Sequence, residues 1–511
     1  MSSSEESGNR GEGLRARLGK QTAMYTLGLL AGRALSFLSL PIYTRLLTPA
    51  DYGVIQLIEM TFDMLTILAG SRIGHGVFRF YHKATRDEDK KAVLSTALTV
   101  LFITFSVIAV GAWTSAEALS ELIFGSERYA TAIKIASLSF PWGGVMGVSM
   151  GYLRLKGRAA TFVSLGLVKA LIQLIVVMIL LGGLGWDLTG VFVGTLVANT
   201  IVGGGVVAYL IKSAGIGFQA KAARDLIRFG LPLVVTQVAT FFTTFGDRYF
   251  LQNAVGEAAV GIYALAYSFG FLLFQLGYSS FDQVWGPMRF EVANRTDREV
   301  VLQRVFLIMN VLLVTSAVGI SIFVFDLLRI MSPAEYWGAA DFVPVILVAY
   351  LFQGWSAFLD LGILVREETR YVTYANWAAA ALAGLGYWFL IPIIGGWGAA
   401  FSTAAAFGLR ALLINRFAQR LWPVHYEWAP VRRLLAVGVV TVGLSLFIPF
   451  MPLVPSLAIR SVVMLVFVVI VWNMNVLPPE EVEVARRKVR ELWAAVRRRG
   501  LGWWVLRPGS W

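Results

Sequence analysis

AATFVSLGLVKALIQLIVVMILLGG, residues 159–183, contains one charged side chain, Lys169, in a stretch long enough to cross a lipid bilayer. A helix rises 1.5 Å per residue, so a hydrocarbon core roughly 30 Å thick takes about 20 apolar residues. Thirteen further stretches are also mostly apolar and long enough to cross a bilayer. They lie at 21–46, 52–78, 91–114, 129–152, 187–211, 227–252, 258–286, 301–326, 339–365, 371–394, 396–420, 432–451 and 456–477. The sequence therefore predicts an all-α, polytopic membrane protein with about fourteen transmembrane helices.

The composition excludes several functional classes. Of the 511 residues 57% are hydrophobic and 15% are charged, and fourteen spans leave only short loops and two tails. A soluble module of about 100–200 residues, which chemistry driven by ATP or activated sugars needs, does not fit. There is no cysteine, the three histidines are scattered, and no P-loop, Gly-x-Ser-x-Gly or His-Glu-x-x-His motif occurs. We therefore expect a transporter rather than an enzyme, with no metal and no cofactor.

The distribution of basic residues predicts the orientation. With a cytoplasmic amino terminus, 34 of the 44 lysines and arginines fall in cytoplasmic loops and tails, and five fall in outer loops or helix ends. Cytoplasmic loops of membrane proteins are enriched in these residues. Both termini are therefore expected inside, in a multi-pass protein of the cell inner (plasma) membrane. The same topology accounts for the net charge of +13, so we expect no nucleic-acid partner.

A weak internal repeat predicts the organisation. Residues 43–57 and 249–265 each read as a helix end, a short outer turn and a helix that opens with glycine, at Gly53 and Gly261, about 208 residues apart. Both copies begin spans that run in the same direction, which indicates a parallel repeat. Two pseudo-symmetric six-helix lobes around a central cavity, with two extra helices, follow from this pattern. The expected segments are a cytoplasmic tail at 1–20, lobes at 21–212 and 213–421, helices 13–14 at 422–477 and a basic tail at 478–511.

The basic tail reads as an amphipathic helix. Its glutamates stand in the first turn and its arginines in the last, while apolar residues recur at helical spacing. We expect this helix to lie on the anionic inner leaflet and contact membrane lipids, although a solvated basic tail fits the same pattern.

Three charged residues from different helices fall at one depth. Arg33 stands about 12 residues above the inner end of its span, Lys169 about 10 above the inner end of its span, and Asp63 about 11 below an outer end, so each is roughly 15–18 Å deep. Charges inside a bilayer usually face the bundle interior or a water-filled cavity. We predict that Arg33 and Lys169 bind an anion such as a diphosphate, with Arg410 as the corresponding cation of the second lobe.

Further polar residues share this depth. Glu59 is one helical turn from Asp63, Gln173 is one turn from Lys169, and Asn199 reaches a similar level. Gln173 and Asn199 are predicted to line the cavity, and the two carboxylates to balance the cations or take up H⁺ or Na⁺. The alternative is a closed network of ion pairs that only fixes helix packing.

The stretch LPIYTRLLTPADYGV, residues 40–54, resembles the opening of Wzx-type polysaccharide-biosynthesis flippases, members of the multidrug/oligosaccharidyl-lipid/polysaccharide (MOP) exporter superfamily. The likeness is specific over about 60 residues, from 19 to 81, and the fourteen-span plan agrees with it throughout. It implies translocation of an undecaprenyl-diphosphate-linked oligosaccharide by alternating access, coupled to an ion gradient or the membrane potential. Proteins of polysaccharide assembly are the implied partners. Pro41 and Gly53 would then act as hinges of the first two helices.

Three other functions remain open. A multidrug or small-molecule cation antiporter of the same architecture would present an apolar pocket with an acidic residue. A membrane glycosyltransferase, ligase or polymerase would need an acidic catalytic pair or a sizeable outer loop. A scaffold of an envelope-assembly complex would keep the fold without transport.

Overall fold

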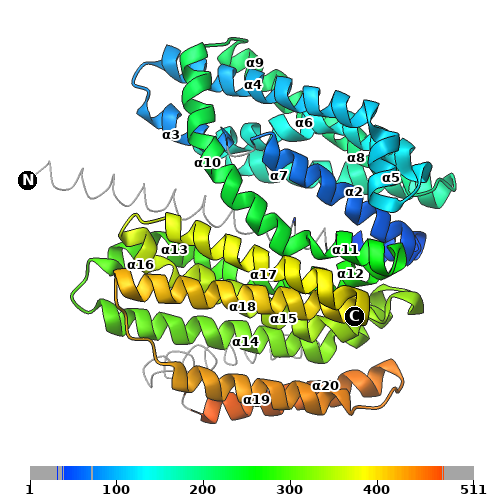
Figure 1. Ribbon diagram of the computed structural model, residues 1–511, viewed down its shortest axis with the longest axis vertical. Helices are drawn as coiled ribbons and strands as arrows, with labels where there is room; N and C mark the ends of the chain where they lie inside the picture. The colour runs from blue at the N-terminus through cyan, green and yellow to red at the C-terminus, as the bar shows by residue number, and fades with distance from the viewer. Residues whose placement is uncertain (1–31, 33–36, 38, 71–72, 475, 477–511) are drawn as a thin grey trace, which may run out of the picture. The chain divides into compact units, whose positions relative to one another are not determined.

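The computed structural model describes residues 32, 37, 39–70, 73–474 and 476, and all regular structure among them is helical (Figure 1). The α-helices are α2 Pro49–Leu68, α3 Ile73–Lys83, α4 Asp87–Thr114, α5 Ala116–Phe124, α6 Ala130–Leu155, α7 Ala159–Val177, α8 Thr189–Ala198, α9 Gly204–Ala214, α10 Ala220–Phe245, α11 Asp247–Ala254, α12 Glu257–Leu273, α13 Ser280–Ala293, α14 Arg298–Met331, α15 Ala339–Leu359, α16 Leu361–Val365, α17 Arg370–Ile394, α18 Gly396–Leu421, α19 Trp428–Leu446 and α20 Leu453–Asn473. Short 3₁₀ turns, η1 Glu127–Tyr129 and η5 Ala334–Tyr336, and π-helical segments, η2 Met178–Gly183, η3 Asn199–Gly203 and η4 Phe274–Ser279, complete the order.

The prediction of an all-α, polytopic membrane protein is confirmed. Ten helices among the described residues are long and apolar enough to cross a membrane, and an eleventh is added when the bent pair 220–231 and 234–245 counts as one span. Helices α2 and α6 occupy two further predicted spans. The first predicted span, 21–46, lies mostly outside the described residues, as do the tails 1–20 and 478–511.

The start of α2 is fixed by its own sequence. The Thr48 side chain accepts a hydrogen bond from the Asp51 backbone N–H at 3.2 Å, and the Asp51 carboxylate accepts one from the Thr48 N–H at 3.2 Å. This is a capping box, with Pro49 in the first turn, where a missing N–H costs nothing. The helix therefore begins sharply at Pro49, four residues before Gly53.

Contacts group the chain into two compact units. The first contains the described residues up to Ser268 together with Leu327–Ile346 and Thr373–Arg410. Its hydrophobic core includes one cluster around Val54, Ile58 and Phe192 and another around Leu101 and Phe105. The second contains Phe269–Asp326, Leu347–Val372 and the described part of Ala411–Trp511. The lobe boundaries expected from the repeat stay a prediction.

The second unit contains a cluster of packed aromatic side chains. Rings of α13, α14, α15, the segment before α19 and the first residue of α19 pack at centroid distances of 5.0 to 6.1 Å. The residues are Trp285, Phe306, Trp355, Phe358, Tyr426 and Trp428. Trp355 also donates to the Asn310 side-chain oxygen at 2.7 Å. These contacts supply large apolar area with defined geometry.

Candidate functional site

A cavity of about 560 Å³ opens in the first unit, among helices α2, α4, α6 and α8 and the segment η3. Most of its wall is apolar or glycine. Its polar lining consists of Glu59, Asp63, Thr66, Ser139, Thr195 and Asn199. An apolar cavity with a few convergent polar groups is the common form of a small-molecule or substrate site.

Helix α2 supplies both charged residues of the cavity wall. Glu59 and Asp63 are four positions apart, so both side chains lie on one helix face, and both are exposed to the cavity. Gln56 donates to the Glu59 carboxylate at 3.3 Å. The predicted pairing of the two carboxylates on one face is thus present, and both are accessible to a ligand or an ion.

Helix α6 contributes glycines to the same cavity wall. Gly143, Gly144 and Gly147 all line the cavity. A Cβ atom built at Gly147 meets nothing within 4 Å, whereas one at Gly144 would meet the Phe105 ring at 2.5 Å. The size of the cavity therefore depends on side chains that α6 lacks.

Asn199 lies at the start of the π-helical segment η3, and its side chain lines the cavity. The residue is 6% exposed, and its Oδ1 atom has no hydrogen-bond partner among the described residues. Burying such an atom without a partner costs about 1–3 kcal/mol. A π-segment with a buried, unsatisfied amide next to an open space is typical of a functional position.

Gln173 and Lys169, the two predicted site residues of α7, do not line the cavity but interact with residues that do. Gln173 donates to the Thr195 hydroxyl at 3.0 Å, and Thr195 lines the cavity. Lys169 is half-buried and interacts electrostatically with Glu59, although it is not among the lining residues. The structure therefore brings Glu59, Asp63 and Asn199 together, with Gln173 connected through Thr195.

The other predicted site residues lie elsewhere. Arg33 is outside the described residues, Arg410 is half-buried in α18 and is not among the residues that line the cavity, and Pro41 lies in the helical stretch 39–46. Gly53 is buried in the first turns of α2. Both charged residues described in the wall are acidic, so the cationic wall expected from Arg33 and Lys169 remains a prediction.

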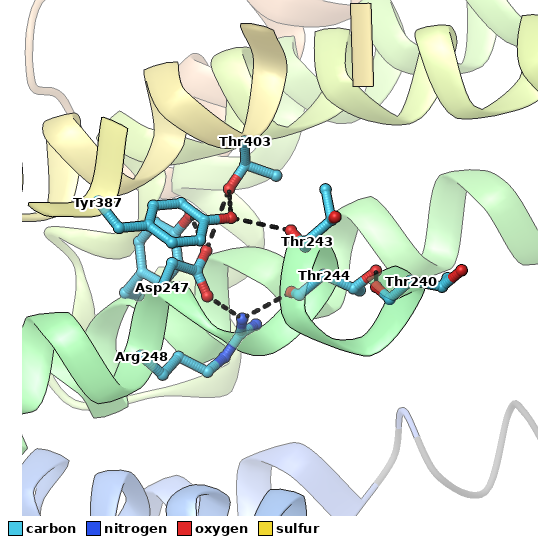
Figure 2. Close-up of polar contacts among 8 residues, drawn as sticks. Thr240, Thr243, Thr244, Asp247, Arg248, Tyr387 and Thr403 are labelled. Carbon is cyan, nitrogen blue, oxygen red and sulfur yellow. Dashed lines mark hydrogen bonds and ion pairs between the residues drawn. The ribbon is translucent and has the colours of Figure 1, made fainter. Parts of the chain in front are cut away.

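A second polar cluster, which the sequence analysis did not identify, surrounds the junction of α10 and α11 (Figure 2). Asp247 and Arg248 are 0% and 1% exposed and form an ion pair at 2.7 Å. The other Asp247 oxygen accepts hydrogen bonds from the Tyr263 hydroxyl at 2.9 Å and the Thr403 hydroxyl at 3.2 Å. The carboxylate is therefore enclosed by donors from three other positions of the fold.

Arg248 is held by aromatic rings as well as by its carboxylate. Its guanidinium lies 4.1 Å from the Tyr267 ring centroid and 5.5 Å from that of Tyr263, and it donates to the Thr244 carbonyl at 3.0 Å. Contacts of this kind between cations and aromatic faces strengthen when water is excluded. Tyr387 extends the cluster by donating to the Thr243 carbonyl at 2.8 Å (Figure 2). This cluster connects the junction of α10 and α11 to α12, α17 and α18.

The comparisons with known proteins identify the class and then the family. The fold is that of membrane transporters: a solved structure titled "Lipid II flippase MurJ, inward closed conformation" aligns with a TM-score of 0.73 at 13% identity, over 88% of this chain and 99% of that one. A multidrug resistance MATE family transporter of the MOP superfamily, in an inward-facing conformation, aligns with a TM-score of 0.62 at 14% identity, over 76% of this chain and 94% of that one.

The family follows from the sequence match. The model of the polysaccharide biosynthesis protein family matches residues 18–293, more than half of the chain, and the protein belongs to that family. The curated succinoglycan biosynthesis transport protein ExoT of Rhizobium meliloti (strain 1021) is 24% identical over 412 residues, which cover 78% of this chain and 77% of that protein. The protein is thus an integral membrane protein of the polysaccharide biosynthesis protein family, as the resemblance of residues 40–54 predicted, and its fold is similar to that of the MurJ and MATE structures.

Proposed function

We propose that the protein moves an undecaprenyl-diphosphate-linked oligosaccharide from the inner to the outer leaflet of the cytoplasmic membrane by alternating access. The observation that carries the proposal is a cavity among membrane helices with a few polar side chains in its wall, in a chain of the polysaccharide biosynthesis protein family. Its carboxylates, hydroxyls and amide can hydrogen-bond to sugar hydroxyls, while the lipid tail stays in the bilayer. The similarity to a protein named for succinoglycan transport agrees with such a substrate.

The proposed role of each side chain follows from its charge. Lys169, Arg33 and Arg410 bind the diphosphate, because cations in a low-dielectric environment attract phosphate strongly. Glu59 and Asp63 balance these charges or take up H⁺ or Na⁺ as the carrier turns over. Gln173 and Asn199 contact the glycan, and Pro41 permits the first helix to bend. Ion-gradient or membrane-potential coupling supplies the driving force, and polysaccharide-assembly proteins receive the product.

The decisive experiment deletes the gene and measures lipid-linked sugar in each leaflet. Diphospholipid-linked oligosaccharide is expected to build up on the inner face and to return to normal when the intact gene is restored. Lys169→Ala should lower the restored outward flux about tenfold or more, since a charged hydrogen bond is worth roughly 1.5–3 kcal/mol. Lys221→Ala, at an exposed position of α10, is the matched control and should restore flux fully. An unchanged leaflet distribution in the deletion strain contradicts the proposal.

A second function is favoured by the acidity of the described cavity wall. Glu59 and Asp63 in a largely apolar cavity are also suited to a lipophilic cation, as in an antiporter that exports small molecules. In that case the deletion strain would show altered sensitivity to cationic drugs with unchanged lipid-linked sugar. Glu59→Gln would then abolish drug export, whereas Lys169→Ala would leave it in place.

A further inference from the structure

The polar side chains in the described wall of the cavity offer mainly hydrogen-bond acceptors. These six side chains include no lysine, arginine, histidine, tyrosine or tryptophan. Glu59 and Asp63 present carboxyl oxygens, which keep acceptor capacity in either protonation state. A ligand in contact with α2 therefore has to bring the donors itself.

The hydroxyl groups of the wall have already donated their protons. Each donates to a backbone carbonyl three or four residues earlier in its own helix, at 2.8 to 3.0 Å. These hydroxyls belong to Thr66, Ser139 and Thr195. A hydroxyl has one proton to donate and two lone pairs that accept. With the proton used inside the helix, each of these oxygens is left as an acceptor.

Asn199 adds an acceptor that has no partner. Its side chain lines the cavity and is 6% exposed, and its Oδ1 atom has no hydrogen bond among the described residues. Its Nδ2 atom lies toward α6, at 3.5 Å from a Cβ atom built at Gly143. A buried carbonyl oxygen without a donor is costly, so a ligand with an N–H or O–H group would complete this site.

The apolar part of the wall suits a ligand with apolar faces between its donors. Phe62, Phe105, Phe140 and Phe192 line the cavity, and the Phe140 ring centroid lies 5.3 Å from that of Phe62 and 4.8 Å from that of Phe105. A sugar ring carries C–H groups on its faces and hydroxyls around its rim. It can pack on these aromatic rings while its hydroxyls donate to the surrounding oxygens.

We propose that this cavity selects sugars by charge, binding a neutral or amino sugar of the lipid-linked glycan and rejecting a sugar that carries a carboxylate, such as a uronic acid. A carboxylate can only accept hydrogen bonds, and the described wall would bury it beside two carboxyl groups with no cationic donor. The hydroxyl or ammonium group of the selected sugar donates to Asn199. The inference rests on the proposed flippase function and narrows its substrate class.

Two probes that differ at a single sugar carbon test this selection. The purified full-length protein is titrated with a short-chain polyprenyl diphosphate that carries either glucose or glucuronic acid, so the lipid and the diphosphate are the same in both. The glucosyl probe should bind at least about tenfold more tightly, because its hydroxyl donates where the carboxylate cannot. Equal affinities overturn the inference alone. If neither probe binds, the flippase proposal fails together with it.

Substitutions in the wall show whether the selection arises in this cavity. Asp63→Asn supplies an amide donor and should reduce the preference for the glucosyl probe several-fold. Asp89→Asn, at an exposed position of α4, is the matched control and should leave the preference unchanged. Asn199→Ala should weaken binding of the glucosyl probe roughly two- to tenfold and change that of the glucuronosyl probe little. An unchanged preference in a folded Asp63→Asn variant contradicts the proposal, and the comparison of probes on the unaltered protein decides the question if the variant does not fold.

Discussion

Asp247 and Arg248 form a buried ion pair, and each depends on the other. Removing one partner of a buried ion pair costs roughly 3–5 kcal/mol, because the remaining charge stays uncompensated, whereas replacing both is often close to neutral. Arg248→Met should therefore destabilise the folded protein by about that amount. The double variant Asp247→Asn, Arg248→Met should recover most of it, because asparagine still accepts from the Tyr263 hydroxyl. Thermal unfolding of the purified protein in detergent measures both, and an equally unstable double variant argues against the charge explanation.

Gly147 tests whether the cavity is used. Its missing side chain leaves open space, so Gly147→Trp should fill the cavity without straining α6. Outward flux of lipid-linked sugar should fall about tenfold or more, with unfolding temperature within a few degrees of wild type. Gly166→Trp on α7 is a fair comparison, because its Cβ also meets nothing within 4 Å and it does not line the cavity. Full transport by the Gly147 variant would mean that substrate does not pass here.

Residues could be predicted from the sequence where helical periodicity and depth decide their place. Glu59 and Asp63 share a face because they are four positions apart, and Asn199 lines the same cavity. The Asp247 cluster could not be found in this way. Its partners Tyr263, Tyr387 and Thr403 come from three other helices, and nothing in the sequence shows that these side chains converge.

At the scale of elements, a buried ion pair fastens α20 to α14. Arg460 lies 3.0 Å from the Asp326 carboxylate and donates to the Ile322 carbonyl, while Ser456 donates to Asp326 at 2.7 Å. In the sequence, Asp326 and Arg460 stand at the edges of separate apolar stretches, 134 residues apart. Helix α20 is thus part of the packed unit, and its exposed face carries apolar side chains such as Val462 and Leu465.

A substitution at Ser456 tests how strongly the contact between α14 and α20 stabilises the protein. Ser456→Ala removes a hydrogen bond to a buried carboxylate and should lower the free energy of unfolding by about 1–3 kcal/mol. Ser445→Ala is the matched control, because that buried hydroxyl bonds only within its own helix, to the Val442 carbonyl at 2.7 Å. Denaturant unfolding should separate the two variants. Equal losses would show that the contact between α14 and α20 adds nothing beyond burial.

Elements differ in how far the sequence determines them. The positions of the spans follow from hydropathy, since the bilayer sets the length of an apolar helix. The π-segments η2, η3 and η4 do not, because an inserted residue shifts the helical phase without altering the hydropathy of the span. The bend at 231–234 is marked by Pro232, although proline alone does not fix the 42° angle.

At the scale of the whole molecule, the repeat predicts a pairing that hydropathy cannot. Two stretches 208 residues apart begin helices in the same way, and their glycines meet in the structure. The family resemblance implies that helix α2 bends at Gly53, whereas the structure adds a packing reason for the glycine. The contact partner, Gly261, is more than 200 residues away in the sequence. The repeat therefore marks both glycines, but the sequence does not show that they touch each other.

The direction of transport depends on the orientation in the membrane, which the basic residues predict. Ala118 is exposed on α5 and lies on the side with few cations, whereas Thr296 is exposed between α13 and α14 on the cation-rich side. In the cysteine-free protein, Ala118→Cys should react with an impermeant maleimide in intact cells, and Thr296→Cys only after permeabilisation. The opposite pattern would place the start of α2 at the cytoplasmic end. The proposed outward direction of transport would then lose the support that the basic residues give it.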